Sequence, residues 1–167
     1  MVTKHSPYLV DPNRLGDVIA AIQAMGTYKF YKLSFEKWAD RISGDSSKSD
    51  HWRTIFQEHP EFFRLDGPRE RASLVWRRQY PKRFHVDKES RLSRDEYYQL
   101  TNEEQARVSR NPLTPDDIKA LIGTAIDLHA RALEQKKEGR WWLALMSAAG
   151  GLIGAILGAL LKGSALK

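Results

Sequence analysis

Residues 34–78 read SFEKWADRISGDSSKSDHWRTIFQEHPEFFRLDGPRERASLVWRR, and this stretch decides the fold. In its first half, large apolar side chains recur every three or four residues, which predicts one helix over residues 35–43 and another over residues 50–59. Residues that cap or stop helices stand at the boundaries: Ser34, Gly44, Ser49 or Asp50, and Pro60. The second half predicts a hairpin of strands 62–65 and 72–77, because the turn residues Gly67 and Pro68 lie between them.

The sequence before this stretch predicts one more helix and one more strand. Apolar residues at helical spacing mark a helix over residues 12–25, with Asp11 as its candidate cap and Gly26 as its end. Residues 28–33, YKFYKL, interleave aromatic side chains with lysine and predict a short strand. The expected order is therefore helix, strand, helix, helix and hairpin, an α+β fold.

This order resembles the winged helix-turn-helix superfamily over about residues 10–85. The resemblance rests on SFEKWADRIS, the turn GDSSKS, the third helix SDHWRTIFQEHP and the hairpin FFRLDGPRERASLVWRR as the wing. It implies that the third helix and the wing face DNA or a protein partner. The residues that could make such contacts are Arg53, Gln57, Arg69, Arg71, Arg77 and Arg78. Asp50 and Glu58 on the same helix would repel phosphates, so a protein partner and DNA both stay open.

The charge of the chain is basic and unevenly spread. The 27 Lys and Arg residues exceed the 21 Asp and Glu residues, which gives a net charge of +6. Residues 64–83 alone hold seven basic side chains and two acidic ones. A stretch of this kind can contact nucleic acid, an acidic protein or the anionic leaflet of a membrane.

Residues 141–161, WWLALMSAAGGLIGAILGALL, contain no charged residue. As a helix they would be roughly 32 Å long, which matches the ~30 Å hydrocarbon core of a bilayer. Trp141 and Trp142 fall where an aromatic belt would lie at the membrane interface. We therefore expect a single-pass, tail-anchored membrane protein with a cytoplasmic N-terminal domain and the lipid bilayer as one partner. A buried core helix is the alternative.

Small residues form two adjoining rows within this run. Gly150, Gly154 and Gly158 make one row at four-residue spacing, and Ser147, Gly151, Ala155 and Ala159 make the other. In lipid, small residues let helix backbones approach closely and associate. The glycine-zipper pattern predicts a homo-oligomer held together by Gly150, Gly151, Gly154, Ala155 and Gly158. The alternative is that glycine is simply common in transmembrane helices.

The expected organisation follows from these elements. A winged-helix-like domain over residues 1–90 precedes a charged connector, 91–113, in which two short helices are expected. Thr114 and Pro115 then begin an amphipathic stalk helix, 114–139, which leads to the transmembrane helix, 140–162, and a short tail, 163–167. The apolar stripe of the stalk either pairs with other helices or packs on the domain itself.

No pattern in the sequence indicates catalysis. Cysteine is absent, the histidines show no metal-ligand spacing, and no glycine-rich phosphate loop or nucleophile elbow occurs. We expect a non-enzymatic protein without cofactor or metal that self-associates in the membrane and binds a partner, with a membrane-perturbing effector as one form of it. A membrane-tethered DNA-binding transcriptional regulator is the alternative, and a basic wing that lies on the anionic leaflet is a third.

Overall fold

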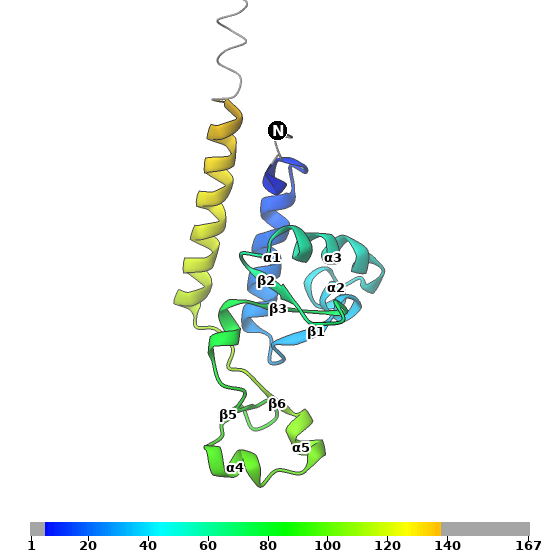
Figure 1. The fold of residues 1–167 in the computed structure, drawn as a ribbon, viewed down its shortest axis with the longest axis vertical. Coiled ribbons are helices and arrows are strands. Elements are labelled where there is room, and N and C mark those ends of the chain that lie inside the picture. The colour runs from blue at the N-terminus through cyan, green and yellow to red at the C-terminus, as the bar shows by residue number, and fades with distance from the viewer. Residues whose placement is uncertain (1–5, 138–167) are drawn as a thin grey trace, which may run out of the picture. The chain divides into compact units, whose positions relative to one another are not determined.

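The computed structural model describes residues 6–137, which form an α+β fold (Figure 1). The helices are α1 (Arg14–Thr27), α2 (Phe35–Ser43), α3 (Ser49–Glu58), α4 (Arg94–Tyr98), α5 (Asn102–Ala106) and a last helix over residues 115–137. The strands are β1 (Lys32–Ser34), β2 (Phe63–Leu65), β3 (Arg71–Leu74), β4 (Phe84–His85), β5 (Ser90–Arg91) and β6 (Val108–Ser109). Short 3-10 turns add η1 (Pro7–Leu9), η2 (Ser46–Lys48) and η3 (Trp76–Gln79).

The first sheet is antiparallel, with the strand order β1-β3-β2. Its register places Lys32 and Arg64 on either side of Ser73, and it pairs Phe63 with Leu74. Because side chains alternate between the two faces of a strand, Lys32, Ser73 and Arg64 share one face of the sheet, and Phe63 and Leu74 share the other.

The helices α1, α2 and α3 cover the apolar face of this sheet and form the core. Trp38 of α2 is fully buried, and its indole N–H donates to the carbonyl of Ala72 on β3 at 2.9 Å. Phe56 of α3 packs against Phe63 of β2 with the two rings tilted and their centroids 5.0 Å apart. The apolar side chains that recur at helical spacing in α2 and α3 face the core: Phe35, Trp38, Ala39, Trp52, Ile55 and Phe56 are buried, and Ile42 is half-buried.

The predicted helices over 35–43 and 50–59 are confirmed to within one residue, and Gly44 ends α2 in the left-handed region, with φ 68°. The expectation that Gly26 ends the first helix is wrong, because α1 continues to Thr27. A β-carbon on Gly26 would lie 3.1 Å from Ile118, so glycine serves close packing here. The first strand begins at Lys32 instead of residue 28, and the second hairpin strand ends at Leu74, where η3 follows.

The connector holds both expected short helices. Ser93 and Glu96 form a capping box on α4, and Thr101 and Glu104 form one on α5. The connector also contributes to a second antiparallel sheet of two-residue strands, in the order β5-β4-β6, which the sequence pattern did not predict.

The chain divides into a unit up to His129 and a second unit from Ala130. In the first unit, the helix that starts at residue 115 runs antiparallel to α1. Leu113 donates its N–H to the carbonyl of Gly26 at 2.9 Å, and the ring of His129 lies 5.8 Å from that of Tyr8 in η1. Leu121 and Ala125 are buried, so this part of the stripe packs on its own domain, whereas Ile126 is 47% exposed. Of the second unit, residues 130–137 are described and continue the helix.

Among the described residues, no helix combines the length and the apolar character needed to cross a bilayer. The expected transmembrane helix over 140–162 and the tail over 163–167 lie outside the described residues. So do the residues predicted for self-association and for the membrane interface: Trp141, Trp142, Gly150, Gly151, Gly154, Ala155 and Gly158.

Candidate basic binding surface

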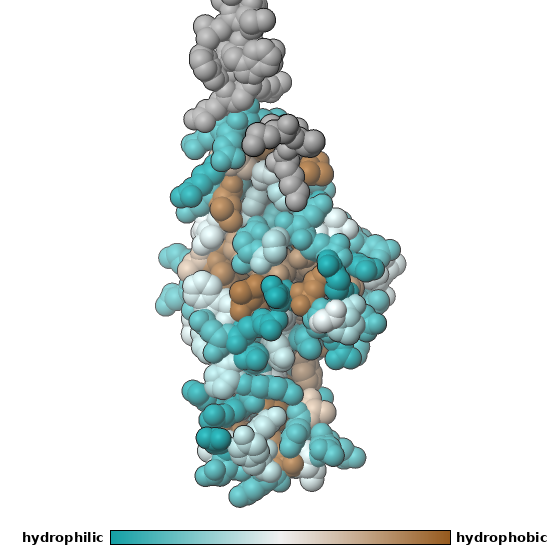
Figure 2. All heavy atoms as spheres, viewed as in Figure 1, coloured by the Kyte–Doolittle hydropathy of each residue, from teal (hydrophilic) through white to brown (hydrophobic). Residues whose placement is uncertain are grey.

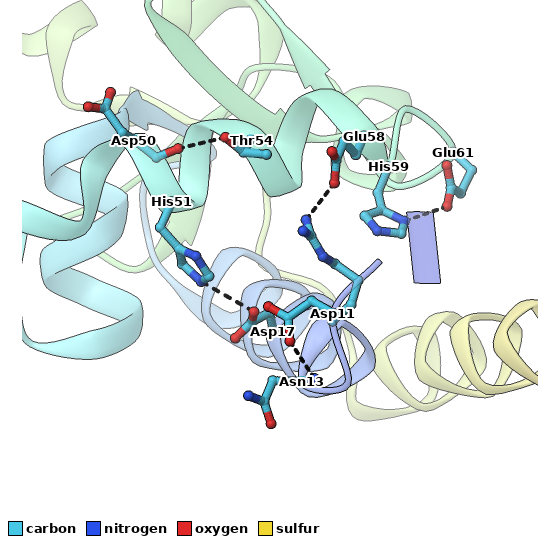
Figure 3. Close-up of polar contacts among 10 residues, drawn as sticks. Asp11, Asn13, Asp17, Asp50, His51, Thr54, Glu58, His59 and Glu61 are labelled. Atoms are coloured by element: carbon cyan, nitrogen blue, oxygen red, sulfur yellow. Dashed lines mark hydrogen bonds and ion pairs between the residues drawn. The ribbon is translucent and has the colours of Figure 1, made fainter. Parts of the chain in front are cut away.

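The side of α3 that faces α1 is tied to it by two polar pairs. The imidazole of His51 lies 3.2 Å from the carboxylate of Asp17 (Figure 3). The carboxylate of Glu58 lies 2.7 Å from the guanidinium of Arg14. Asp50 is exposed at the start of the same helix. These carboxylates leave α3 poorly suited to approach a phosphate backbone.

Two residues predicted for partner contacts lie on the exposed side of α3. The guanidinium of Arg53 stacks 5.5 Å from the ring centroid of Phe35 and remains exposed. Gln57 is also exposed, one turn further along. Both side chains are therefore accessible to a partner.

The wing turn between β2 and β3 is held by the side chain of Asp66. Its Oδ1 accepts the backbone N–H groups of Glu70 and Arg71, at 3.0 and 3.1 Å. Desolvation acts to raise the pKa of Asp66. The pKa nevertheless lies below its usual range, because these N–H groups and the nearby Lys32 and Arg71 stabilise the carboxylate. Arg69 takes a left-handed conformation in this turn, with φ 62°. The locked turn presents Arg69 and Arg71 to solvent.

A hollow of about 420 Å³ lies between α3 and the wing turn, and we call it the wing hollow. It brings together two residues predicted for partner contacts, Gln57 and Arg69. Arg64, the first residue of the basic stretch over residues 64–83, was not predicted as a contact residue and also lines it. The wing hollow thus joins the third helix and the wing in one basic surface.

Arg77 belongs to the core rather than to a binding surface. Its side chain is fully buried, and its guanidinium donates five hydrogen bonds to backbone carbonyls, those of Met25, Tyr28, Lys29, Arg110 and Asn111. The first three carbonyls lie at the end of α1, where the last carbonyls of a helix lack intrahelical partners and favour a cation. Burial, together with the like charge of Arg110, lowers the pKa of Arg77 to about 10, so it stays protonated at neutral pH.

A second hollow, of about 310 Å³, lies on the outer face of the first sheet, and we call it the sheet-face pocket. Of the predicted contact residues it contains Arg78, which is exposed. Its other basic residues, Lys32, Arg64 and Arg110, were not predicted as site residues. The strand register brings Lys32 and Arg64 together, and Arg110 comes from the segment after β6; composition reveals neither placement.

A buried polar cluster lies where η1 meets the end of α3. The ring of Tyr8 lies 4.5 Å from that of His59. Figure 3 shows the contact between His59 and Glu61, in which Nδ1 lies 2.9 Å from a carboxylate oxygen. Burial and then the negative charge of Glu61 raise the pKa of Tyr8. Among the described residues, the Tyr8 hydroxyl finds no hydrogen-bond partner.

The surface around these sites is mostly hydrophilic. On the face drawn in Figure 2, hydrophobic side chains appear only in separate small groups. Within residues 6–137, no group of three or more metal-binding side chains gathers in one place. Compared with protein-family models, curated proteins and solved structures, the chain matches none of them.

Proposed function

We propose that the chain is a non-enzymatic, membrane-anchored protein that self-associates through residues 141–161 and binds an acidic partner through a winged-helix domain. The helix over residues 115–137 is the observation that carries this proposal. It packs on α1 at its start and continues, throughout the described part, to a point four residues before Trp141. A domain joined in this way to an apolar run is suited to being held at a membrane.

The order of elements supports the winged-helix assignment. Along the chain the elements follow the order α1, β1, α2, α3, β2 and β3, and the antiparallel sheet has the strand order β1-β3-β2. The partner surface in this proposal is the wing hollow with its surroundings, where Arg64 and Arg69 line the depression and Arg53 and Arg71 lie exposed. Because exposed charges are screened by salt, binding of an acidic partner weakens as ionic strength rises.

Self-association tests the membrane half of the proposal. We expect Gly154→Ile to convert an oligomer of the full-length chain in mild detergent into a monomer, because a branched side chain keeps the helix backbones apart. Leu152→Ile is the matched control, since residue 152 lies outside both rows of small residues. Light scattering coupled to size exclusion gives the mass. An oligomer of unchanged size in Gly154→Ile would exclude the zipper.

DNA binding is the second candidate function, favoured by the exposure of Arg69 and Arg71 on the wing turn and by Gln57 in the wing hollow. The carboxylates on α3 argue against it. If the full-length protein binds a DNA duplex, the logarithm of its affinity falls linearly with the logarithm of the salt concentration, and Arg69→Gln makes that slope less steep. A gel-shift titration at low salt tests this function, and a duplex that does not shift would exclude DNA binding.

A further inference from the structure

We propose that the sheet-face pocket binds the dianionic phosphate group of a small phosphorylated molecule. This proposal goes beyond the proposed function, because it concerns the hollow on the outer face of the sheet and does not depend on membrane anchoring. The sheet-face pocket shares residues 64–67 with the wing hollow, whereas Lys32, Arg78 and Arg110 belong to the sheet-face pocket alone. It rests on three properties of the pocket: the placement of its side chains, its unbalanced charge and its size.

The strand register brings the donors of the pocket into one row. Lys32 on β1 and Arg64 on β2 flank Ser73 on the central strand β3, all on the face that points away from the helices. Directly paired side chains on neighbouring strands lie about 5 Å apart at Cβ. Lys32 and Arg64 can therefore reach an anion above Ser73 from opposite sides.

Two arginines from outside the sheet, Arg78 and Arg110, complete the pocket, and Arg110 is anchored to the main chain. Arg110 donates from Nη1 to the carbonyls of Arg78 and Tyr80, and its guanidinium lies 5.0 Å from the ring centroid of Tyr31. Tyr31 is in turn fixed by its N–H, which donates to the hydroxyl of Ser109 at 3.0 Å. A site whose side chains are already oriented loses less entropy when it binds a ligand.

The positive charge of the pocket is not neutralised within the described residues. Four cations line it, Lys32, Arg64, Arg78 and Arg110, against the single carboxylate of Asp66. Asp66 already accepts two backbone N–H groups, and its contact with Lys32 is long, at 3.9 Å. In the described part of the chain, the three arginines of the pocket form no ion pair.

The protein interior behind the pocket adds to this field. The buried cation of Arg77 donates to the carbonyl of Arg110 at 2.5 Å, and its hydrogen bonds go to carbonyls rather than to a carboxylate. Nε of Arg110 is buried and has no hydrogen-bond partner among the described residues. An anion in the pocket would therefore be attracted by the buried charge of Arg77 as well as by the lining arginines. Arginine forks match the oxygens of a phosphate group particularly well.

The size of the pocket indicates a small ligand. A volume of about 310 Å³ is at the lower end of ordinary ligand pockets, which begin near ~300 Å³. The lining is polar, formed mainly by basic side chains, Tyr31 and Ser73, with Leu65 as its one large aliphatic residue. The pocket thus suits a phosphate group with a short polar substituent.

The experiment titrates inorganic phosphate and glycerol 3-phosphate into the full-length protein in a neutral detergent at low salt, with heat as the readout. We expect saturable one-site binding of both. Arg64→Gln and Arg78→Gln should each weaken it about tenfold or more, because each removes a charge-assisted hydrogen bond. Arg91→Gln is the matched control, since Arg91 is exposed on β5 and changes the net charge equally. Circular dichroism verifies that each variant is folded.

Three outcomes would overturn the proposal. One is that neither phosphate compound binds, and another is that Arg91→Gln weakens binding as much as the pocket variants do. The third concerns the source of the phosphate: a phosphoserine peptide that binds more than ten times tighter than inorganic phosphate would exclude a small-molecule ligand. None of these results changes the oligomeric state, so failure here is distinguishable from failure of the proposed function.

Discussion

Replacing the buried Arg77 with methionine tests the structural account of the core most severely. The change keeps much of the side-chain volume but removes all five hydrogen bonds to backbone carbonyls. A buried carbonyl left without a donor costs about 1–3 kcal/mol. Relaxation and water satisfy part of the five carbonyls, so we expect the free energy of unfolding to fall by about 3–5 kcal/mol.

The neighbouring residue provides the control. Arg78 is exposed, so Arg78→Met should change the free energy of unfolding by no more than about 0.5 kcal/mol. For a chain of this length, 1 kcal/mol corresponds to about 2–4 °C in Tm. We therefore expect Arg77→Met to lower Tm by roughly 6–20 °C and Arg78→Met to leave it nearly unchanged.

The assay is thermal unfolding of the full-length protein in detergent, followed by circular dichroism. Arg77→Lys adds a further comparison, since lysine keeps the charge but lacks the planar fork, and should lie between Arg77→Met and the wild type. Equal Tm values for Arg77→Met and Arg78→Met would refute the argument that the Arg77 hydrogen bonds hold α1 to the residues around Arg110.

Two other substitutions probe the packing of α1 and η1. Tyr8→Phe should remove part of the loss of stability at high pH. The pKa of Tyr8 is raised in the folded state, so its contribution to the free energy of unfolding is complete below the unfolded pKa of about 10 and falls above it. The fall amounts to as much as about 1.4 kcal/mol at pH 11. Urea unfolding at pH 8 and pH 11 measures this, and an identical pH dependence in both proteins would contradict it. Gly26→Leu should destabilise by about 1–3 kcal/mol, because a β-carbon there already lies 3.1 Å from Ile118. Gly16→Leu in the same helix is the control: a β-carbon at residue 16 meets no atom within 4 Å, so this change should stabilise the fold by up to ~1 kcal/mol. If Gly26→Leu were as stable as Gly16→Leu, the contact with Ile118 would not be restrictive.

The helices of the N-terminal domain could be predicted from sequence because their signals are local. Phe35, Trp38 and Ala39 recur at helical spacing, and Gly44 supplies the left-handed residue that ends α2. The beginning of β1 could not be predicted in this way. Tyr28 follows the end of α1 directly, and two of the carbonyls that Arg77 binds lie at Tyr28 and Lys29, so long-range contacts decide where the strand begins.

The candidate sites depended even more on tertiary structure. In the sequence, Arg77 and Arg78 are adjacent arginines in a basic stretch, yet one is buried and the other exposed. What separates them is the carbonyl cluster around Arg77, contributed by segments at least 33 residues away. Likewise, Lys32 and Arg64 come together only through the register of β1 and β2 on β3.

Membrane anchoring by residues 141–161 is the central claim, and extraction with alkaline carbonate tests it most directly. Membranes that contain the full-length protein are washed at high pH, which releases peripheral proteins but leaves membrane-spanning ones in the pellet. We expect the wild type to stay in the pellet. A variant with Leu152→Lys and Ile156→Lys should appear in the supernatant, because each lysine at the centre of a membrane helix opposes insertion by about 2.5–3.5 kcal/mol. Release of the wild-type protein into the supernatant would contradict the claim.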